Sequence, residues 1–194
     1  MKGHALILAP ILAPMLAVML CACAPKPPAE QEELRCTYYS DGKPWSELVY
    51  FRGVPDGPAR TWHPDGRLAS EGNYDRGRKS GRWQRWFRDG NVSLDATYRE
   101  GYLDGPFLEA WPDGKVKSQG QLEMGRPAGH WIEWHRNGTK QLEGRYRAGE
   151  REGVWTAWLP DGTLRGRAVY ARGKLVTDPA RKQAALDAEP LPEH

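Results

Sequence analysis

Small or apolar residues alternate with polar residues along short segments of this chain. Between residues 68 and 74, the even positions carry Leu68, Ser70, Gly72 and Tyr74, whereas the odd positions carry mostly polar side chains. A period of two places the even residues on one face of a β-strand and the odd residues on the other. The pattern therefore predicts strands with one covered face and one solvated face.

The same pattern returns every 24 residues. Its clearest column is a glycine preceded by Asp or Asn, which occurs at Gly42, Gly66, Gly90, Gly114, Gly138 and Gly162. Two further glycine columns and a mostly Tyr column, from Tyr50 to Tyr170, keep the same spacing. Several independent columns with one period indicate tandem repeats. We expect about six units between residues 34 and 177.

Each unit reads Gly-x-Trp-x-x-Trp-x-x-Asp-Gly, followed by a segment ending in Tyr and a Gly-rich return. An Asp-Gly pair between two strand-forming segments is a strong hairpin signal, because the turn needs residues with positive φ. We therefore predict an all-β fold, an elongated and twisted antiparallel meander of about six β-hairpins. Twelve strands spaced about 4.8 Å apart would extend for roughly 55–60 Å.

This pattern resembles the bacterial variant of the MORN repeat, which is often met in proteins described as antitoxin-like. The resemblance covers residues 34–177 and is carried by residues 81–86 (Gly-Arg-Trp-Gln-Arg-Trp) and by their counterparts at 129–134 and 153–158. It implies a twisted meander of hairpins, and two possible roles: neutralising a toxin, or binding lipid directly. The third unit departs from the pattern, since Ala110 occupies the second Trp column and Trp111 follows it.

The two Trp columns are predicted to point to opposite faces. In a hairpin closed by a two- or four-residue loop, the first column faces Gly or Ala, pairing Trp83 with Ala96 and Trp131 with Gly144. A ring lying over such a small residue shields its backbone, so this column and the Tyr column should form a thin core. The second column lies three residues later, an odd separation that predicts the other face. Its members are Trp62, Trp86, Trp134 and Trp158.

Two interpretations of this second column stay open. Exposed rings would make it a candidate contact surface that stacks on a sugar or grips a peptide, as aromatic residues do at binding hot spots. Alternatively, a bulge turns the rings inward, or they only cover the sheet. We favour the second interpretation.

Composition narrows the class of protein. The chain has 22 Gly, 16 Pro and 9 Trp among 194 residues, which is turn-rich but too aromatic for a disordered chain. The net charge is +3 and the charges are interspersed along the sequence, whereas a nucleic-acid binder would normally show a basic stripe. We therefore expect no nucleic-acid partner.

The residues that would carry catalysis are missing from the pattern. There is no nucleophile elbow, zinc-protease motif or phosphate-binding loop. His63 and His135 share one repeat column but lie 72 residues apart, so they cannot converge on a metal. The recurring Asp is explained by turn chemistry rather than calcium. We predict no catalytic residues, metal, cofactor or small-molecule substrate.

The N-terminus resembles a bacterial lipoprotein signal. Residues 1–22 contain Lys2 and an apolar stretch at 5–20, which is short for a transmembrane helix, and Leu20-Cys21-Ala22-Cys23 resembles a lipobox. The resemblance implies that Cys23 is lipidated and, because Ala24 follows it, that the protein faces the periplasm from the outer membrane. Residues 23–33 would be a Pro-rich tether. A plain signal peptide or an uncleaved anchor is the alternative.

The C-terminal segment, residues 178–194, predicts a short helix. Asp178 is a candidate N-cap with Pro179 at the first helical position, and the helix would cap the last edge strand. Taken together, we expect a non-enzymatic scaffold, anchored in the cell envelope, that binds a protein or peptidoglycan. The antitoxin-type and lipid-binding roles are the alternatives.

Overall fold

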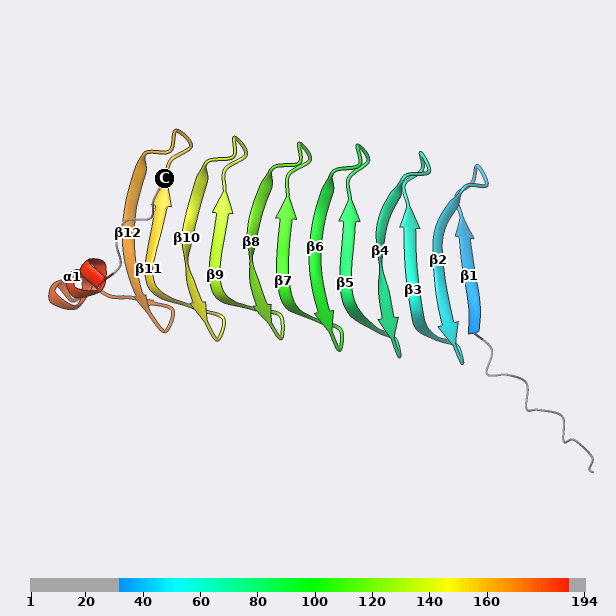
Figure 1. The fold of residues 1–194 in the computed structure, drawn as a ribbon, viewed down its shortest axis with the longest axis horizontal. Helices are drawn as coiled ribbons and strands as arrows, with labels where there is room; N and C mark the ends of the chain where they lie inside the picture. The colour runs from blue at the N-terminus through cyan, green and yellow to red at the C-terminus, as the bar shows by residue number, and fades with distance from the viewer. Residues whose placement is uncertain (1–31, 189–194) are drawn as a thin grey trace, which may run out of the picture. The chain divides into compact units, whose positions relative to one another are not determined.

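The computed structural model describes residues 32–188, which form one antiparallel sheet followed by one helix (Figure 1). The strands are β1 (Glu32–Tyr38), β2 (Pro44–Phe51), β3 (Val54–Trp62), β4 (Leu68–Asp75), β5 (Arg78–Trp86), β6 (Val92–Arg99), β7 (Tyr102–Ala110), β8 (Val116–Glu123), β9 (Arg126–Trp134), β10 (Lys140–Arg147), β11 (Glu150–Trp158), β12 (Leu164–Ala171) and β13 (Lys174–Leu175). The helix is α1 (Pro179–Ala188).

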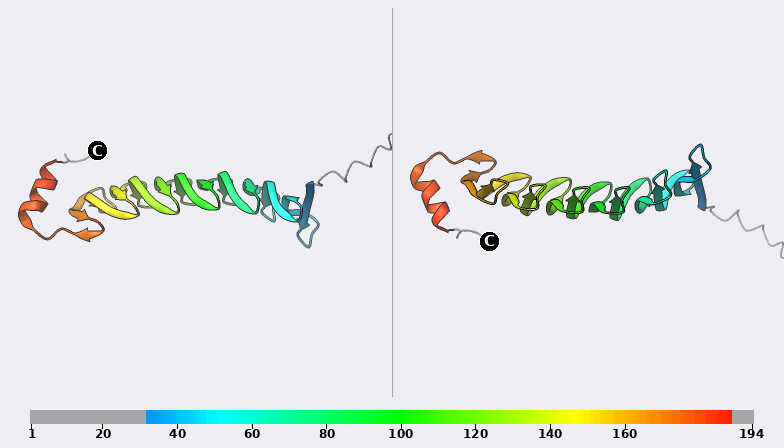
Figure 2. Two further views of the ribbon diagram at one scale, coloured as in Figure 1. Left: turned by 90° about the horizontal axis from the view of Figure 1, so that it is seen from below. Right: turned by 90° about the horizontal axis from the view of Figure 1, so that it is seen from above.

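The strands follow one another across the sheet in chain order, so the predicted all-β meander is confirmed. There are thirteen strands in the described residues rather than twelve, because the chain turns back once more into the two-residue β13. Seen edge-on, the sheet is a single layer (Figure 2). No helix among residues 32–188 is long and apolar enough to cross a bilayer.

Two kinds of tight turn alternate between the strands. At one edge, the loop from His63 to Arg67 closes with hydrogen bonds from Gly66 N to His63 O (2.8 Å) and from His63 N to Arg67 O (2.8 Å). The Asp65 carboxylate accepts a hydrogen bond from Arg67 N (3.0 Å), which explains why Asp recurs there. We call this edge the Asp-Gly edge. Its loops span residues 39–43, 63–67, 87–91, 111–115, 135–139 and 159–163.

At the opposite edge, the Gly-rich returns are two-residue turns that are just as tight. Both central residues have positive φ, as in Ala148 (52°) and Gly149 (84°), the geometry of a type I′ hairpin. In every one of these six turns a residue other than Gly takes the first left-handed position: Arg52, Arg76, Glu100, Met124, Ala148 and Arg172.

The sheet has an aromatic face and a polar face. The aromatic face carries Trp83, Phe107, Trp131 and Trp155, while neighbouring residues such as Arg82 point to the polar face because side chains alternate along a strand. Trp83, Trp131 and Trp155 are 6%, 8% and 2% exposed. Rings of the Tyr column meet them edge-on, for example Tyr146 and Trp155 at 4.8 Å between centroids. The predicted thin core is therefore confirmed.

The ring positions correct one detail of that prediction. Trp131 does pair with Gly144 across the hairpin, but its ring covers Gly120 on the preceding strand, where an added Cβ would lie 2.1 Å from Trp131 Cε3. Trp155 covers Gly144 in the same way. The reason is a bulge: around Gly129, β9 carries extra residues relative to β8 between the pairs Gln119–Ile132 and Gln121–Ala128. Each ring thus ties its own repeat to the one before.

The C-terminal end of the sheet is covered. Arg181 N donates a hydrogen bond to Asp178 Oδ1 (3.1 Å), so the predicted N-cap is confirmed. Helix α1 contacts β11 and β12, whereas we had expected it to cap the last edge strand. On the polar face of these two strands, Val154 and Val169 are 6% and 4% exposed. In the repeat before, His130 and Arg145 stand at these positions and are exposed, so the sequence turns apolar where the sheet is covered.

Candidate binding surface

Pairs of polar side chains repeat along the polar face. Arg60 and Glu71 lie 3.3 Å apart, and His130 Nε2 lies 2.8 Å from Glu143 Oε1. Between these pairs, Arg82 Nε donates to Asp95 Oδ1 (2.8 Å). The Arg82 hydrogen bonds hold the pKa of the Asp95 carboxyl below its ordinary range, against a smaller opposing effect of burial. The face is therefore polar but largely paired with itself.

A hollow opens on the polar face in the middle of the sheet, between β5 and β8. One side is the Arg82–Asp95 pair, and the floor includes Leu108. The exposed side chains of Pro106, Gln119 and Gln121 line the rest, together with Thr97. Apolar carbon, amide donors and acceptors, and an ion pair thus meet within one concavity, a mixture typical of surfaces that recognise a peptide or protein.

The second Trp column lies on the polar face, as its odd spacing predicted. Lys140 contacts both the column and a residue of the polar face. Its Nζ lies 3.0 Å from Glu143 Oε2 and 5.7 Å from the centroid of the Trp158 ring. The register of the sheet shifts by one residue just before the column, for example between Arg85 and Trp86.

The column does not form an exposed ladder. Trp158 is 6% exposed and is therefore excluded from an open contact surface. It is the last residue of β11, one of the two strands that α1 contacts. Trp62, Trp86 and Trp134 are half-buried. Each of these three side chains is therefore partly covered.

The two edges of the sheet differ in charge, which the interspersed sequence does not reveal. The two-residue turns opposite the Asp-Gly edge, taken with the one strand residue on either side, carry eight basic residues: Arg52, Arg76, Arg78, Arg99, Arg126, Arg147, Arg172 and Lys174. They carry four acidic residues: Asp75, Glu100, Glu123 and Glu150. The six Asp-Gly loops, by contrast, contain five basic and five acidic residues. We call the first edge the basic edge.

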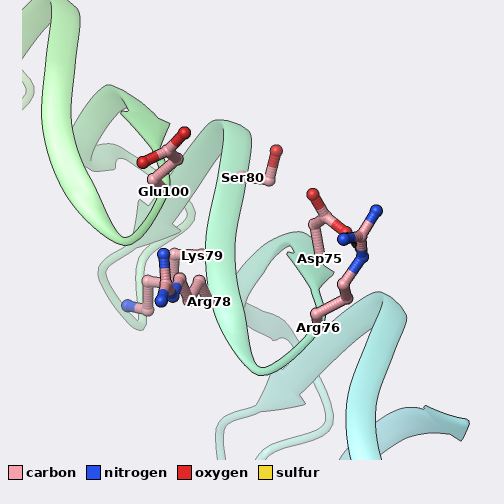
Figure 3. Close-up of a pocket in the computed structure, with 6 residues that line it drawn as sticks. All are labelled: Asp75, Arg76, Arg78, Lys79, Ser80 and Glu100. Carbon is pink, nitrogen blue, oxygen red and sulfur yellow. Dashed lines mark ion pairs between the residues drawn. The ribbon is translucent and has the colours of Figure 1, made fainter.

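Apolar side chains are also exposed on the basic edge. Val54, Tyr102 and Met124 are 43%, 55% and 58% exposed. A shallow hollow at the same edge is lined by residues of the β4–β5 turn, by Ser80 and by Glu100 (Figure 3). Lys79 also lines this hollow. Its Nζ lies 4.2 Å from the centroid of the Trp83 ring, and burial lowers the pKa of this ammonium group.

His63 and His135 have a structural role that the sequence did not indicate. His63 Nε2 lies 3.0 Å from Trp86 O and His135 Nε2 lies 2.9 Å from Trp158 O, so each ring donates to a carbonyl of the next repeat. Tyr39 makes the equivalent bond to Trp62 O (2.7 Å). Within residues 32–188, no group of three His, Cys, Asp or Glu side chains is placed to hold a metal ion.

The chain is thus, in class, a single-layer β-repeat protein with one hollowed polar face. Comparison with known families places a MORN repeat variant at residues 55–76, which cover β3, the following loop and β4. No curated protein matches the sequence of this chain. The other units follow the same 24-residue spacing and the same strand register as residues 55–76. The predicted lipidation residue, Cys23, and the predicted signal at 1–22 lie outside the described residues.

Proposed function

We propose that this protein is a non-enzymatic scaffold, anchored in the bacterial envelope by a lipid on Cys23, that binds a protein partner through its polar face. The observation that carries the proposal is the hollow between β5 and β8, where Leu108 and Pro106 lie beside the Gln119 and Gln121 side chains. Among residues 32–188 the sheet is one layer thick, and no second layer lies over this face along the middle repeats (Figure 2). Extended contact of this kind suits a repeat protein.

A protein partner is favoured over the peptidoglycan alternative by the state of the aromatic rings. Sugars stack on open ring faces, and the second Trp column presents half-buried rings and one buried ring. The hollow instead offers amide groups and apolar carbon, which match a peptide backbone and its side chains.

Photo-crosslinking in intact cells tests the polar face. A photoreactive amino acid at Gln119 or Gln121 should capture one discrete protein partner from the envelope. The matched control carries it at Arg85, an exposed residue on the aromatic face of the same sheet. Equal capture from Arg85 would overturn the assignment to this face, and capture of glycan strands in place of protein would favour the cell-wall role.

The anchor needs a separate test. Metabolic labelling with a palmitate analogue should label the wild-type chain and the Cys21→Ser variant but not the Cys23→Ser variant. The unlabelled variant should also be released from the membrane fraction. Retained labelling of Cys23→Ser would exclude the lipidation site.

The basic edge supports direct lipid binding as a second candidate. Eight basic residues against four acidic ones, with Val54, Tyr102 and Met124 exposed among them, suit a surface of anionic headgroups. Flotation of the Cys23→Ser protein with vesicles that contain 30% or no anionic lipid (a composition on the order of a natural anionic leaflet) tests it. Binding only to anionic vesicles, reduced at least about tenfold by Arg76→Glu with Arg78→Glu, is the expected result; equal binding to both vesicles would exclude it.

A further inference from the structure

The N-terminal edge of the sheet is an open strand. β1 pairs with β2 over its whole length, and among residues 32–188 no strand lies along its other side. Leu34 and Tyr38 on this strand are 58% and 63% exposed, and Trp45 on β2 is 51% exposed. A strand of this length is a template for pairing with another chain, since its outward N–H and C=O groups have no ladder partner within residues 32–188.

The other end of the sheet is built differently. There the last strand, β13, has only two residues, and α1 contacts β11 and β12. Figure 2 shows α1 at one end of the sheet and β1 at the other. Terminal repeats normally carry such a cap, and within the described chain only the C-terminal end has one.

β1 also lacks two of the features that protect natural edges, a glycine bulge and a proline. Strands β3, β5, β7, β9 and β11 each contain a glycine with positive φ that creates a bulge. The equivalent residue of β1 is Glu33, which does not have a positive φ. β1 contains no proline. A regular, unbulged strand can accept a partner along its length.

The charges of β1 specify the partner. Glu33 and Arg35 flank Leu34, and their side chains already pair on one face, with Arg35 Nε 3.0 Å from Glu33 Oε1. Residues directly opposite one another in a continuous sheet share a face, so an antiparallel second copy must centre on a residue rather than between two. Centring on Leu34 places each Glu33 opposite Arg35 of the other copy.

Dimer registers centred on the neighbouring residues of β1 pair its charges less favourably. Centring on Glu33 opposes two carboxylates, and centring on Arg35 opposes two guanidinium groups, and like charges directly opposite one another destabilise a ladder. A parallel arrangement in register opposes like charges at both positions. Centring on Cys36 avoids repulsion but forms no ion pair, and it would oppose the two Cys36 thiols. The Leu34-centred register alone alternates four charges on one face.

We propose that two copies of this chain associate through β1, antiparallel and centred on Leu34, to continue one sheet across a twofold axis. The axis is perpendicular to the sheet, so the polar faces of both copies lie on the same side. The inference rests on β1 and does not depend on the partner proposed above.

Complementary charge variants test the pairing. Glu33→Arg leaves only positive charge on the face of β1 that residues 33 and 35 share, and Arg35→Glu leaves only negative charge there; both variants lose the pair within their own chain. Each variant of the full-length protein, extracted in detergent, should lose self-association at least tenfold relative to wild type, measured by recovery of a differently tagged copy. Co-expression of the two variants should restore association, because the opposite edges again complement each other.

Cysteine crosslinking then fixes the register. Leu34→Cys in a full-length chain with Cys36→Ser should form a disulfide-linked dimer within the envelope, whereas Asp113→Cys, on the distant Asp-Gly edge, should not. A thermal melt confirms that each variant is folded. The proposal is overturned if wild type sediments as a monomer at micromolar concentration, if the mixed variants fail to associate, or if only the native Cys36 crosslinks.

Discussion

Gly144 lies directly beneath the indole ring of Trp155: a Cβ at this glycine would be 2.3 Å from Trp155 Cδ2. The indole Nε1 donates to Arg145 O (3.1 Å), which fixes the ring over that strand. At the equivalent positions of other repeats, a larger residue on one strand faces a smaller residue on the neighbouring strand. Gly72 lies under Trp83, Ala96 pairs with Phe107, and Leu48 pairs with Ala59. Successive repeats therefore pack with a roughly constant combined volume, as expected for a close-packed interior.

This relationship predicts the effect of a single methyl group. Gly144→Ala should lower the free energy of unfolding by about 1–3 kcal/mol, because the ring or the strand must move to admit the Cβ. Urea denaturation measures it. Adding Trp155→Phe, which recreates the Ala96–Phe107 combination, should cost less than the two single changes summed, by at least about 0.5 kcal/mol. Strict additivity would contradict the packing argument.

The left-handed residue in each two-residue turn predicts a stabilising change. Ala148 has φ 52°, which Asn tolerates better than Ala, and Asn-Gly is the preferred pair in this turn. Ala148→Asn should raise the free energy of unfolding by about 0.5–1 kcal/mol. Ala148→Val, with a β-branched side chain, should lower it. Thermal denaturation of both variants checks the sign, and a destabilising Asn would argue against the turn geometry.

The covered C-terminal end predicts a truncation effect. Removing residues 178–194 should expose Val154, Val169 and Trp158 on the polar face of β11 and β12. We expect a lower melting temperature, increased binding of a hydrophobic dye and red-shifted Trp fluorescence. Trp158→Ala in the full chain should cost about 3–5 kcal/mol as a buried Trp. Trp62→Ala, at the half-buried first position of the column, should cost clearly less. Similar losses would contradict the special environment of Trp158.

The Arg82–Asp95 pair predicts a pH dependence. Arg82 lowers the folded-state pKa of Asp95, so the contribution of this pair to stability is present above the unfolded-state pKa and is lost as pH falls through the folded-state value. Arg82→Gln should therefore destabilise the protein at pH 7 but become neutral well below about pH 4. The matched control is Arg88→Gln, which removes an equal charge at the Asp-Gly edge. A difference that persists unchanged in acid would exclude the ion pair as its cause.

Much of the fold follows from local patterns. The 24-residue period, the alternation along residues 68–74 and the Asp-Gly turns define the meander, because turn chemistry and period-two alternation act over a few residues. The cross-hairpin pair Trp83–Ala96 is confirmed as well. The bulges between repeats lie beyond such rules. Because each bulge adds two residues around a glycine, each Trp ring lies over the preceding strand. No pattern within a single hairpin specifies this position of the ring.

The candidate surfaces depend on contacts that the repeat pattern does not contain. The burial of Trp158 belongs to the covered end of the sheet, so its column position alone predicted nothing about exposure. The basic edge arises because successive turns lie alternately at the two edges of the sheet. Charges that are interspersed along the sequence are thereby distributed unequally between the two edges. The hollow beside Leu108 is likewise a property of two particular neighbouring units rather than of the repeat.

The two-residue turns have a consequence for how such a chain changes length. Inserting one residue into a strand would exchange its two faces, and the turns have no spare residues to absorb the change. A duplicated unit of 24 residues preserves every column and adds two strands, or about 9.6 Å of sheet. This fold therefore accepts duplication and deletion of whole units more easily than insertion of single residues. The length of the sheet changes in fixed increments of one repeat.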